Sequence, residues 1–238
     1  MKITESLQIT RYENGHTLRT TDTVITEYSL AVNVNGTKAA DILCTPTSLC
    51  ELVMGFLFCK GNIHAKEDVI YLRIDEDEGA ANALLNPGAS TCGAVRMRLV
   101  ADDFTVSVRY ILEQAILFYG KSTLFAATGA IHSCCLCGEG SVLCFEEDIS
   151  RHNAVDKVIG RALLDGVTFN RSFLITSGRV PSDMLVKIIR CGIPIIVSRS
   201  APTDTSVAMA KEHNVTLAGF ARGRCINIYS GEQRILLP

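Results

Sequence analysis

Short apolar runs alternate with helix-like periods over the second half of the chain. Apolar runs typical of strands cover 130–137, 141–145, 173–176, 193–197, 215–220 and 226–229. Between them, apolar residues recur at helical spacing over 153–164, 181–191 and 203–212. Strands that alternate with helices of this length predict βαβ units and a sheet covered by helices on both faces.

A β-hairpin is predicted near the start of the chain. Residues 26–33 alternate in part between apolar and polar, as a half-buried strand does. Asn35-Gly36 is a strong signal for a tight hairpin turn, so 38–44 is the expected partner strand.

A helix with one apolar stripe follows this hairpin. Thr45-Pro46 predicts its start, with threonine as cap and proline in the first turn. Ser48 with Glu51 offers a competing capping box, and Gly61 is the expected stop.

The remaining segments of the first half are less regular. We expect a polar peripheral arm over 4–23, strands over 69–74 and 95–100, an ambiguous segment over 80–90 and a helix over 106–119. Residues 1–119 are therefore predicted to form a β-rich extension that carries a cysteine loop, and 120–238 an α/β ligand-binding core. Since no low-complexity linker separates them, one continuous domain is the alternative.

Composition narrows the class of protein. The chain has 238 residues, is 47% hydrophobic and has a net charge of −2. It can therefore bury a large core, and its net charge gives no indication of nucleic-acid binding. We find no apolar stretch long enough to span a membrane and no secretory signal at residues 1–11. The cytoplasm is the expected compartment, where thiols stay reduced.

Ten cysteines are a high count for such a chain. Alternation along 131–137 predicts Cys135 on one face of a strand and Cys134 on the other, and no C-x-x-C pair supports a metal site. Cys92 differs from the rest because it lies in the polar loop N-P-G-A-S-T-C-G-A, where a thiol can be exposed and reactive. The alternative is that Cys92 lies in this loop without a functional role.

Polar clusters follow the predicted core strands, where each strand ends. There are four clusters. The first comprises Arg151, His152, Asn153 and Lys157; the second, Ser177 and Arg179; the third, residues 198–203, which include Thr203; and the fourth, Phe220, Ala221, Arg222, Gly223 and Arg224. If the strands are parallel, these clusters meet at one edge of the sheet, where arginines, glycines and helix N-termini suit a nucleotide or a pyrophosphate. The alternative for the first cluster is the solvated start of an amphipathic helix, capped by Asp148 or Ser150. His132 is either part of this site or a core histidine.

Several of these stretches occur together in one known family. They are T-G-A-I-H from Thr128, E-D-I-S-R-H-N-A-V-D-K from Glu147, L-I-T-S-G-R from Leu174, S-A-P-T from Ser200 and G-F-A-R-G-R from Gly219. With E-Y-S-L-A-V-N-V-N-G and T-P-T-S-L-C-E-L-V-M-G-F-L nearer the start, the chain resembles the FdhD family over about residues 22–230. Members are accessory sulfurtransferases required for active formate dehydrogenase.

The resemblance implies a cytidine-deaminase-like three-layer α/β/α core in a homodimer, although the deaminase zinc signature is absent from this sequence. It also implies that sulfur passes as a persulfide from a cysteine desulfurase to the molybdenum or tungsten of a bis(molybdopterin guanine dinucleotide) cofactor, for the formate dehydrogenase apo-enzyme. Cys92-Gly93 matches the start of the family's C-G-x-C motif, and Val95 replaces the second cysteine, so Cys92 would act alone. The cofactor contact would lie at Phe220 to Cys225.

Two other functions are compatible with the sequence. A non-catalytic chaperone would bind the molybdenum cofactor and leave Cys92 inert. A nucleotide-processing hydrolase or deaminase would share the fold, but no metal-ligand pattern supports it.

Overall fold

The structure, a computed structural model, describes residues 1–88, 99–100 and 103–238. Most of the strand predicted over 95–100, and Cys92 itself, lie outside the described residues, so these two predictions stay predictions. The strands are β1 (Thr4–Glu13), β2 (His16–Ile25), β3 (Tyr28–Val34), β4 (Thr37–Cys44), β5 (Val69–Asp75), β6 (Ala80–Leu85), β7 (Val106–Ser107), β8 (His132–Cys137), β9 (Val142–Asp148), β10 (Phe173–Thr176), β11 (Ile195–Ser198), β12 (Thr216–Arg222), β13 (Cys225–Ser230) and β14 (Ile235–Leu236). The α-helices are α1 (Leu49–Lys60), α2 (Val108–Lys121), α3 (Thr123–Thr128), α4 (Arg151–Leu164), α5 (Ser182–Cys191) and α6 (Asp204–Glu212).

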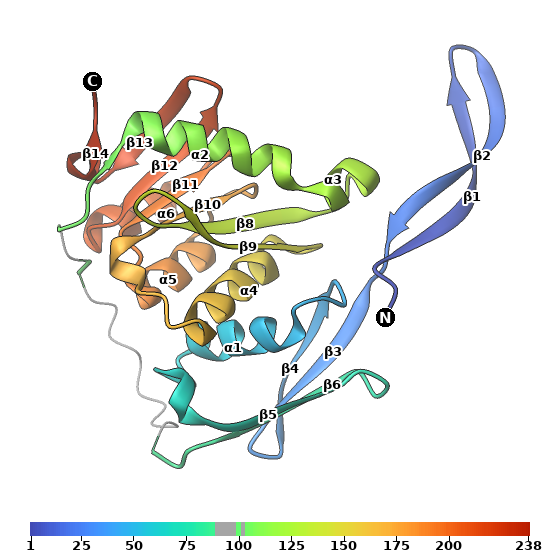
Figure 1. Cartoon of the computed structure of the whole chain (residues 1–238), viewed down its shortest axis with the longest axis horizontal. Helices are drawn as coiled ribbons and strands as arrows, with labels where there is room; N and C mark the ends of the chain where they lie inside the picture. Colours follow the sequence, from blue (N-terminus) through green and yellow to red (C-terminus); the bar gives the residue numbers. More distant parts are fainter. Residues whose placement is uncertain (89–98, 101–102) are drawn as a thin grey trace.

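A six-stranded mixed sheet forms the centre of the molecule, in the order β13-β12-β11-β10-β8-β9. β10, β11 and β12 run parallel, and β8 is antiparallel to both of its neighbours. Residues of α4, α5 and α6 pack against one face, and residues of α2 pack against the other (Figure 1). The predicted three-layer α/β core is therefore confirmed, while its likeness to cytidine deaminases stays a prediction.

The cysteines of β8 divide between the two faces of this sheet as alternation predicts. Cys134 and Leu136 lie in the apolar cluster under α4 and α5, whereas Cys135 and Cys137 lie in the cluster under α2. All three cysteines are fully buried. Burial raises the pKa of the Cys134 and Cys135 thiols well above their ordinary value, so both behave as core residues.

The N-terminal part forms a second body around a four-stranded sheet, in the order β4-β3-β6-β5, with α1 packed against it (Figure 1). The predicted hairpin is confirmed: β3 and β4 pair antiparallel, and both Asn35 and Gly36 have positive φ at their turn. α1 joins the two bodies by crossing α4 at glycines. A Cβ on Gly55 would lie 1.8 Å from the backbone oxygen of Asp156, and one on Gly160 would lie 1.9 Å from that of Glu51.

The polar arm predicted over 4–23 is a regular β-hairpin. β1 and β2 pair from Thr4↔Ile25 to Glu13↔His16. The hairpin projects to one side of the molecule, and β2 contacts α3 (Figure 1). Asn14-Gly15 makes the turn with positive φ at both residues. This is the same signal that predicted the turn at Asn35, but the strands beside it lack an apolar face.

α1 begins later than predicted. Its first residue is Leu49, and Thr45 instead binds the core through its backbone N–H and its hydroxyl, both of which donate to Asp148 Oδ2 over 3.0 Å. Ser48 occupies the N-cap position with φ of 48°, but its hydroxyl donates to Glu146 rather than to the helix. Contacts between the two bodies therefore replace both predicted caps.

α2 packs with the central sheet, although most of its residues lie within the range 1–119. Its Ile111, Ala115 and Phe118 are buried against the six-stranded sheet. β7, just before α2, pairs with β14 at the other end of the chain. In packing terms, α2 therefore belongs to the same body as 120–238.

Candidate functional site

The carboxyl ends of four strands meet at one edge of the central sheet. β9, β10, β11 and β12 all end there, and antiparallel β8 begins there, since His132 pairs with Asp148 and Cys134 pairs with Thr176. The strand ends that precede the predicted polar clusters thus lie at one edge of the sheet. Ligands bind at such edges in open α/β sheets.

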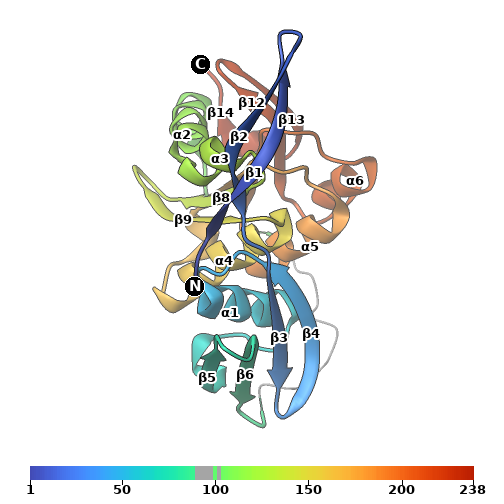
Figure 2. The ribbon, with the colours of Figure 1, turned by 90° about the vertical axis from the view of Figure 1, so that its right-hand side faces the viewer.

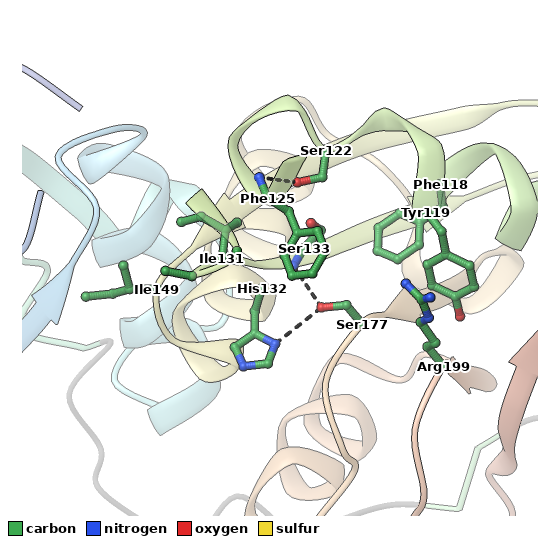
Figure 3. Close-up of a pocket in the computed structure, with 12 residues that line it drawn as sticks. Phe118, Tyr119, Ser122, Phe125, Ile131, His132, Ser133, Ile149, Ser177 and Arg199 are labelled. Carbon is green, nitrogen blue, oxygen red and sulfur yellow. Dashed lines mark hydrogen bonds between the residues drawn. The ribbon is translucent and has the colours of Figure 1, made fainter. Parts of the chain in front are cut away.

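A pocket of about 310 Å³ opens at this edge, between the sheet and the C-terminal part of α2 (Figure 3). Aromatic rings and small polar groups share its wall. It is lined by Phe118, Tyr119, Ser122, Phe125, Gly129, Ala130, Ile131, His132, Ser133, Ile149, Ser177 and Arg199.

Ser177 connects β8 to the end of β10 inside this pocket. Its hydroxyl oxygen accepts from the backbone N–H of Ser133 over 3.0 Å and lies 3.3 Å from Nδ1 of His132 (Figure 3). Burial lowers the pKa of His132, and the nearby Arg151 guanidinium lowers it further. His132 is therefore neutral at pH 7, with the second ring nitrogen left to meet a ligand.

Two serines of the wall, Ser122 and Ser133, are held by Glu147, which does not itself line the pocket. The Ser133 hydroxyl donates to Glu147 Oε1 over 3.3 Å, and the Ser122 hydroxyl donates to the same oxygen. Ser122 also caps α3, because its hydroxyl accepts from the Phe125 N–H over 3.1 Å. These contacts fix the hydroxyl groups in place, so the pocket presents a defined set of polar atoms.

Arg199 brings positive charge to the pocket from the end of β11. Its guanidinium carbon lies 4.9 Å from the centre of the Tyr119 ring, a cation–π contact (Figure 3). Burial raises the pKa of the Tyr119 hydroxyl, and that oxygen has no hydrogen-bond partner within the described part of the chain. Arg222 donates from Nε to the Arg199 carbonyl over 3.0 Å, which places a second cation beside the first.

The sequence-predicted residues divide by their position relative to this pocket. Ser177 lines it. Arg151 lies beside it, with its side chain packed so closely on Gly178 that a Cβ there would lie 2.8 Å from the arginine Cβ. Arg179 is exposed at the end of β10.

Lys157 does not reach the pocket. It is fully buried, its ammonium lies 2.8 Å from Asp148 Oδ2, and it donates to Thr45 Oγ1 over 2.7 Å. The geometry gives Lys157 a structural role, joining the two bodies, rather than the predicted role in ligand binding. Asn153 is similar, since it donates to the Leu43 carbonyl and to Asp148 Oδ1.

Other predicted residues lie away from the pocket wall. His152 lies on the opposite side of the β9–α4 turn, with Nε2 3.5 Å from Asp183. Thr203 caps α6, because its hydroxyl accepts from the Ser206 N–H over 3.3 Å. In the C-terminal cluster, Ala221 is buried. Its other members apart from Arg222 are exposed: Phe220, Gly223, Arg224 and Cys225.

Sequence reasoning missed the aromatic side of the pocket. Phe118, Tyr119 and Phe125 come from α2 and α3, which carry no polar cluster of their own. Tyr119 is the last residue of the helix predicted over 106–119. The available signal is its hydroxyl at the end of that helix, since a buried tyrosine oxygen needs a partner.

Two further observations concern metal ligands and membrane-spanning helices. Across residues 1–88, 99–100 and 103–238, no three His, Cys, Asp or Glu side chains cluster as metal ligands do. None of the helices in these ranges is long and apolar enough to cross a membrane.

The fold and the pocket define a three-layer α/β protein with an aromatic, arginine-bearing pocket at the carboxyl edge of its sheet. The sequence model described as the FdhD/NarQ family matches residues 25–236. Proteins named sulfur carrier protein FdhD from Staphylococcus haemolyticus and Bacillus licheniformis are each 34% identical to the chain, over 98% of it and 97% of their own length. A crystal structure of a protein from Desulfotalea psychrophila, described as a proposed formate dehydrogenase accessory protein, superposes with a TM-score of 0.87 at 29% identity and covers 99% of this chain and 100% of its own.

The chain belongs to the FdhD/NarQ family.

Proposed function

We propose that this chain is a sulfur carrier that activates a formate dehydrogenase, with Cys92 as the sulfur-carrying residue. The match to the family over nearly the whole chain is the observation that carries the proposal. The relatives named above are called sulfur carrier proteins, and the similar solved structure is described as a formate dehydrogenase accessory protein.

The proposed first step is a transfer between thiols. The Cys92 thiolate attacks the outer sulfur of a persulfide on a cysteine desulfurase, a new S–S bond forms on Cys92, and the donor cysteine leaves as a thiolate. No net oxidation occurs, because one S–S bond replaces another. In the second step the outer sulfur, a sulfane sulfur, passes to the molybdenum of the cofactor substrate, and Cys92 keeps the electron pair of the broken S–S bond and returns to thiolate. The two electrons that reduce the transferred sulfur to sulfide would come from the substrate's own molybdenum, supplied in its reduced state.

The carboxyl-edge pocket is the proposed binding site for the guanine end of that substrate. Tyr119 and Phe125 offer ring surfaces, neutral His132 offers a nitrogen, and Arg199 and Arg222 offer charge to a pyrophosphate. The molybdenum or tungsten of a bis(molybdopterin guanine dinucleotide) is here the recipient of sulfur, not a resident metal. A homodimer in the cytoplasm is part of the same proposal.

A second candidate is a chaperone that binds the molybdenum cofactor without moving sulfur. The observation that favours it is Val95, which stands where the family motif C-G-x-C has its second cysteine. This candidate predicts that Cys92 can be replaced without loss of function.

Activation of a formate dehydrogenase tests the proposal. The apo-enzyme is made in cells without their own sulfur carrier and is supplied with this chain, and formate-dependent dye reduction is measured. We expect activity with the natural chain and with Cys50→Ala, a half-buried control cysteine on α1, and loss with Cys92→Ala. Activity of Cys92→Ala equal to that of the control would contradict sulfur transfer and favour the chaperone.

A further inference from the structure

A second, larger cavity lies on the other side of the β9–α4 turn. Its volume is about 650 Å³, and it runs between the edge of β4, the C-terminal end of α1, the start of α4 and one side of α5. The proposed sulfur transfer makes no use of it. Apolar side chains of Ile42, Phe56 and Val186 and a group of charged side chains share its wall.

One wall of this cavity is an unpaired strand edge. β4 is the outermost strand of its sheet, on the side of the molecule where α5 also lies (Figure 2). Leu43 directs its carbonyl away from β3, because that oxygen accepts from Asn153 over 2.8 Å. Residues two apart point the same way in a strand, so Asp41 directs its N–H and C=O into the cavity that it lines.

The floor of the cavity holds a buried carboxylate with one oxygen available. Asp156 is 3% exposed, and its Oδ2 accepts from Lys187 over 2.6 Å. Its Oδ1 has no hydrogen-bond partner within the described ranges, and the Cys59 thiol is a weak donor near the same carboxylate. A buried acceptor without a partner is costly, so this oxygen suits a ligand that brings an N–H.

Two lysines of this region are paired with carboxylates, and two further cations are not. Lys38 pairs with Asp41 and Lys187 pairs with Asp156. Asp183 is largely exposed to solvent and meets the neutral ring of His152, whose pKa burial lowers. Lys60 and Arg190 also line the cavity and have no carboxylate within ion-pair distance among the described residues. Arg190 donates from Nη1 to the Cys59 carbonyl, and its Nε is buried without a hydrogen-bond partner. A ligand group that meets Lys60 and Arg190 therefore carries negative charge.

We propose that the β4 edge and α5 form a docking groove for an extended acidic segment of a partner protein. The segment adds as a strand beside β4, its backbone pairs with Asp41, and one of its N–H groups reaches Asp156. Its acidic side chains meet Lys60 and Arg190. Strand addition beside a helix combines main-chain affinity with side-chain selection, and the mixed apolar and charged walls supply both. This inference goes beyond the proposed function and does not depend on Cys92 or on the carboxyl-edge pocket.

Fluorescence anisotropy with the full chain tests this inference. The probe is a short labelled peptide of alternating threonine and glutamate, compared with versions in which glutamine or lysine replaces glutamate. We expect saturable binding of the acidic peptide, weaker by about tenfold or more for the glutamine version, and none for the lysine version. Lys60→Glu combined with Arg190→Glu is expected to abolish binding of the acidic peptide, whereas Lys211→Glu on exposed α6 leaves it unchanged.

Two variants of Asp41 separate strand addition from charge alone. Asp41→Asn keeps the backbone N–H and is expected to bind, whereas Asp41→Pro removes it and is expected to lose binding, since proline is tolerated at a strand edge. Three outcomes would overturn the proposal. The first is no saturable binding of the acidic peptide, and the second is equal binding by the proline variant and the natural chain. The third is a natural chain that is a dimer and a Lys60→Glu variant that is a monomer, which would make the groove an interface between copies of this chain.

The unfolding midpoint of the proline variant verifies that it is folded.

Discussion

Lys157 and Asp148 form an ion pair with no exposed surface, and Thr45 completes it from the other body. The Lys157 ammonium lies 2.8 Å from Asp148 Oδ2, and the Thr45 hydroxyl donates to the same oxygen over 3.0 Å. Both charged residues are 0% exposed. Removing one charge leaves the other buried without compensation.

Lys157→Met is therefore expected to lower the free energy of unfolding by about 3–5 kcal/mol, because Asp148 loses its partner. Urea denaturation monitored by circular dichroism measures this change. Arg171→Ala is the control, since it breaks only the exposed pair with Glu139 and should leave the midpoint unchanged. Equal midpoints for both variants would show that the buried pair contributes nothing.

His132 makes stability depend on pH. Burial lowers its pKa below the ordinary value of 6.5, so the unfolded chain takes up a proton before the folded chain does. Stability from this group is complete above pH 6.5 and falls as pH drops toward the lowered pKa. His132→Gln should lose less stability than the natural chain between about pH 7 and pH 5 in urea titrations. An identical pH dependence in both chains would remove His132 as the cause.

Arg199 is the cation of the carboxyl-edge pocket, and its removal is expected to weaken binding of GDP about tenfold, as the loss of one charged hydrogen bond does. Isothermal titration of Arg199→Ala against the natural chain measures this. Arg171→Ala, on the far end of β10, is the matched arginine control and should bind GDP as the natural chain does. Unchanged affinity in Arg199→Ala would place the pyrophosphate elsewhere.

At the scale of the element, the crossing of α1 and α4 holds the two bodies together. Both helices carry a glycine where the backbones meet, and neither Gly55 nor Gly160 has room for a Cβ. The constraint comes from the neighbouring helix rather than from an unusual φ, because neither residue has a positive φ.

Gly55→Ala and Gly160→Ala are each expected to destabilise the chain by about 3 kcal/mol or more, since the added carbon would overlap backbone atoms that cannot move alone. Thermal unfolding measures the loss. Gly120→Ala near the end of α2 is the matched control: nothing lies within 4 Å of its added Cβ, so it should be neutral or stabilising. A loss as large in the control would point to a general effect of alanine.

Sequence patterns predicted elements better than they predicted element ends. The apolar runs placed the core strands within a few residues, and the strand-end clusters did meet at one edge, because parallel strands fix that geometry. The start of α1 was wrong, because Thr45 and Ser48 bind residues about a hundred positions away. No local pattern reports such contacts.

The same reason limited the prediction of the site. Ser177 and the arginines at strand ends were accessible from sequence. The aromatic wall comes from α2 and α3, and the position of α2 over the sheet follows from tertiary packing. Lys157 and Asn153 were predicted as ligand residues because they lie in the polar R-H-N-A-V-D-K stretch, yet helical geometry turns both toward the buried seam between the bodies.

At the scale of the whole molecule, the two bodies present three separate features: the carboxyl-edge pocket, the β4 groove and the projecting β1–β2 hairpin. The proposed function assigns the first to the cofactor and relies on Cys92 to bring sulfur to it. This division of work is the central claim, and the thiol is the part that can be tested alone.

The most direct measurement is an intact mass of the chain after incubation with a cysteine desulfurase and cysteine. The account predicts a gain of one sulfur atom that reductant removes, that persists in Cys50→Ala and that is absent from Cys92→Ala. A chain that gains no sulfur while it still binds GDP, or one that gains sulfur equally without Cys92, would contradict the account.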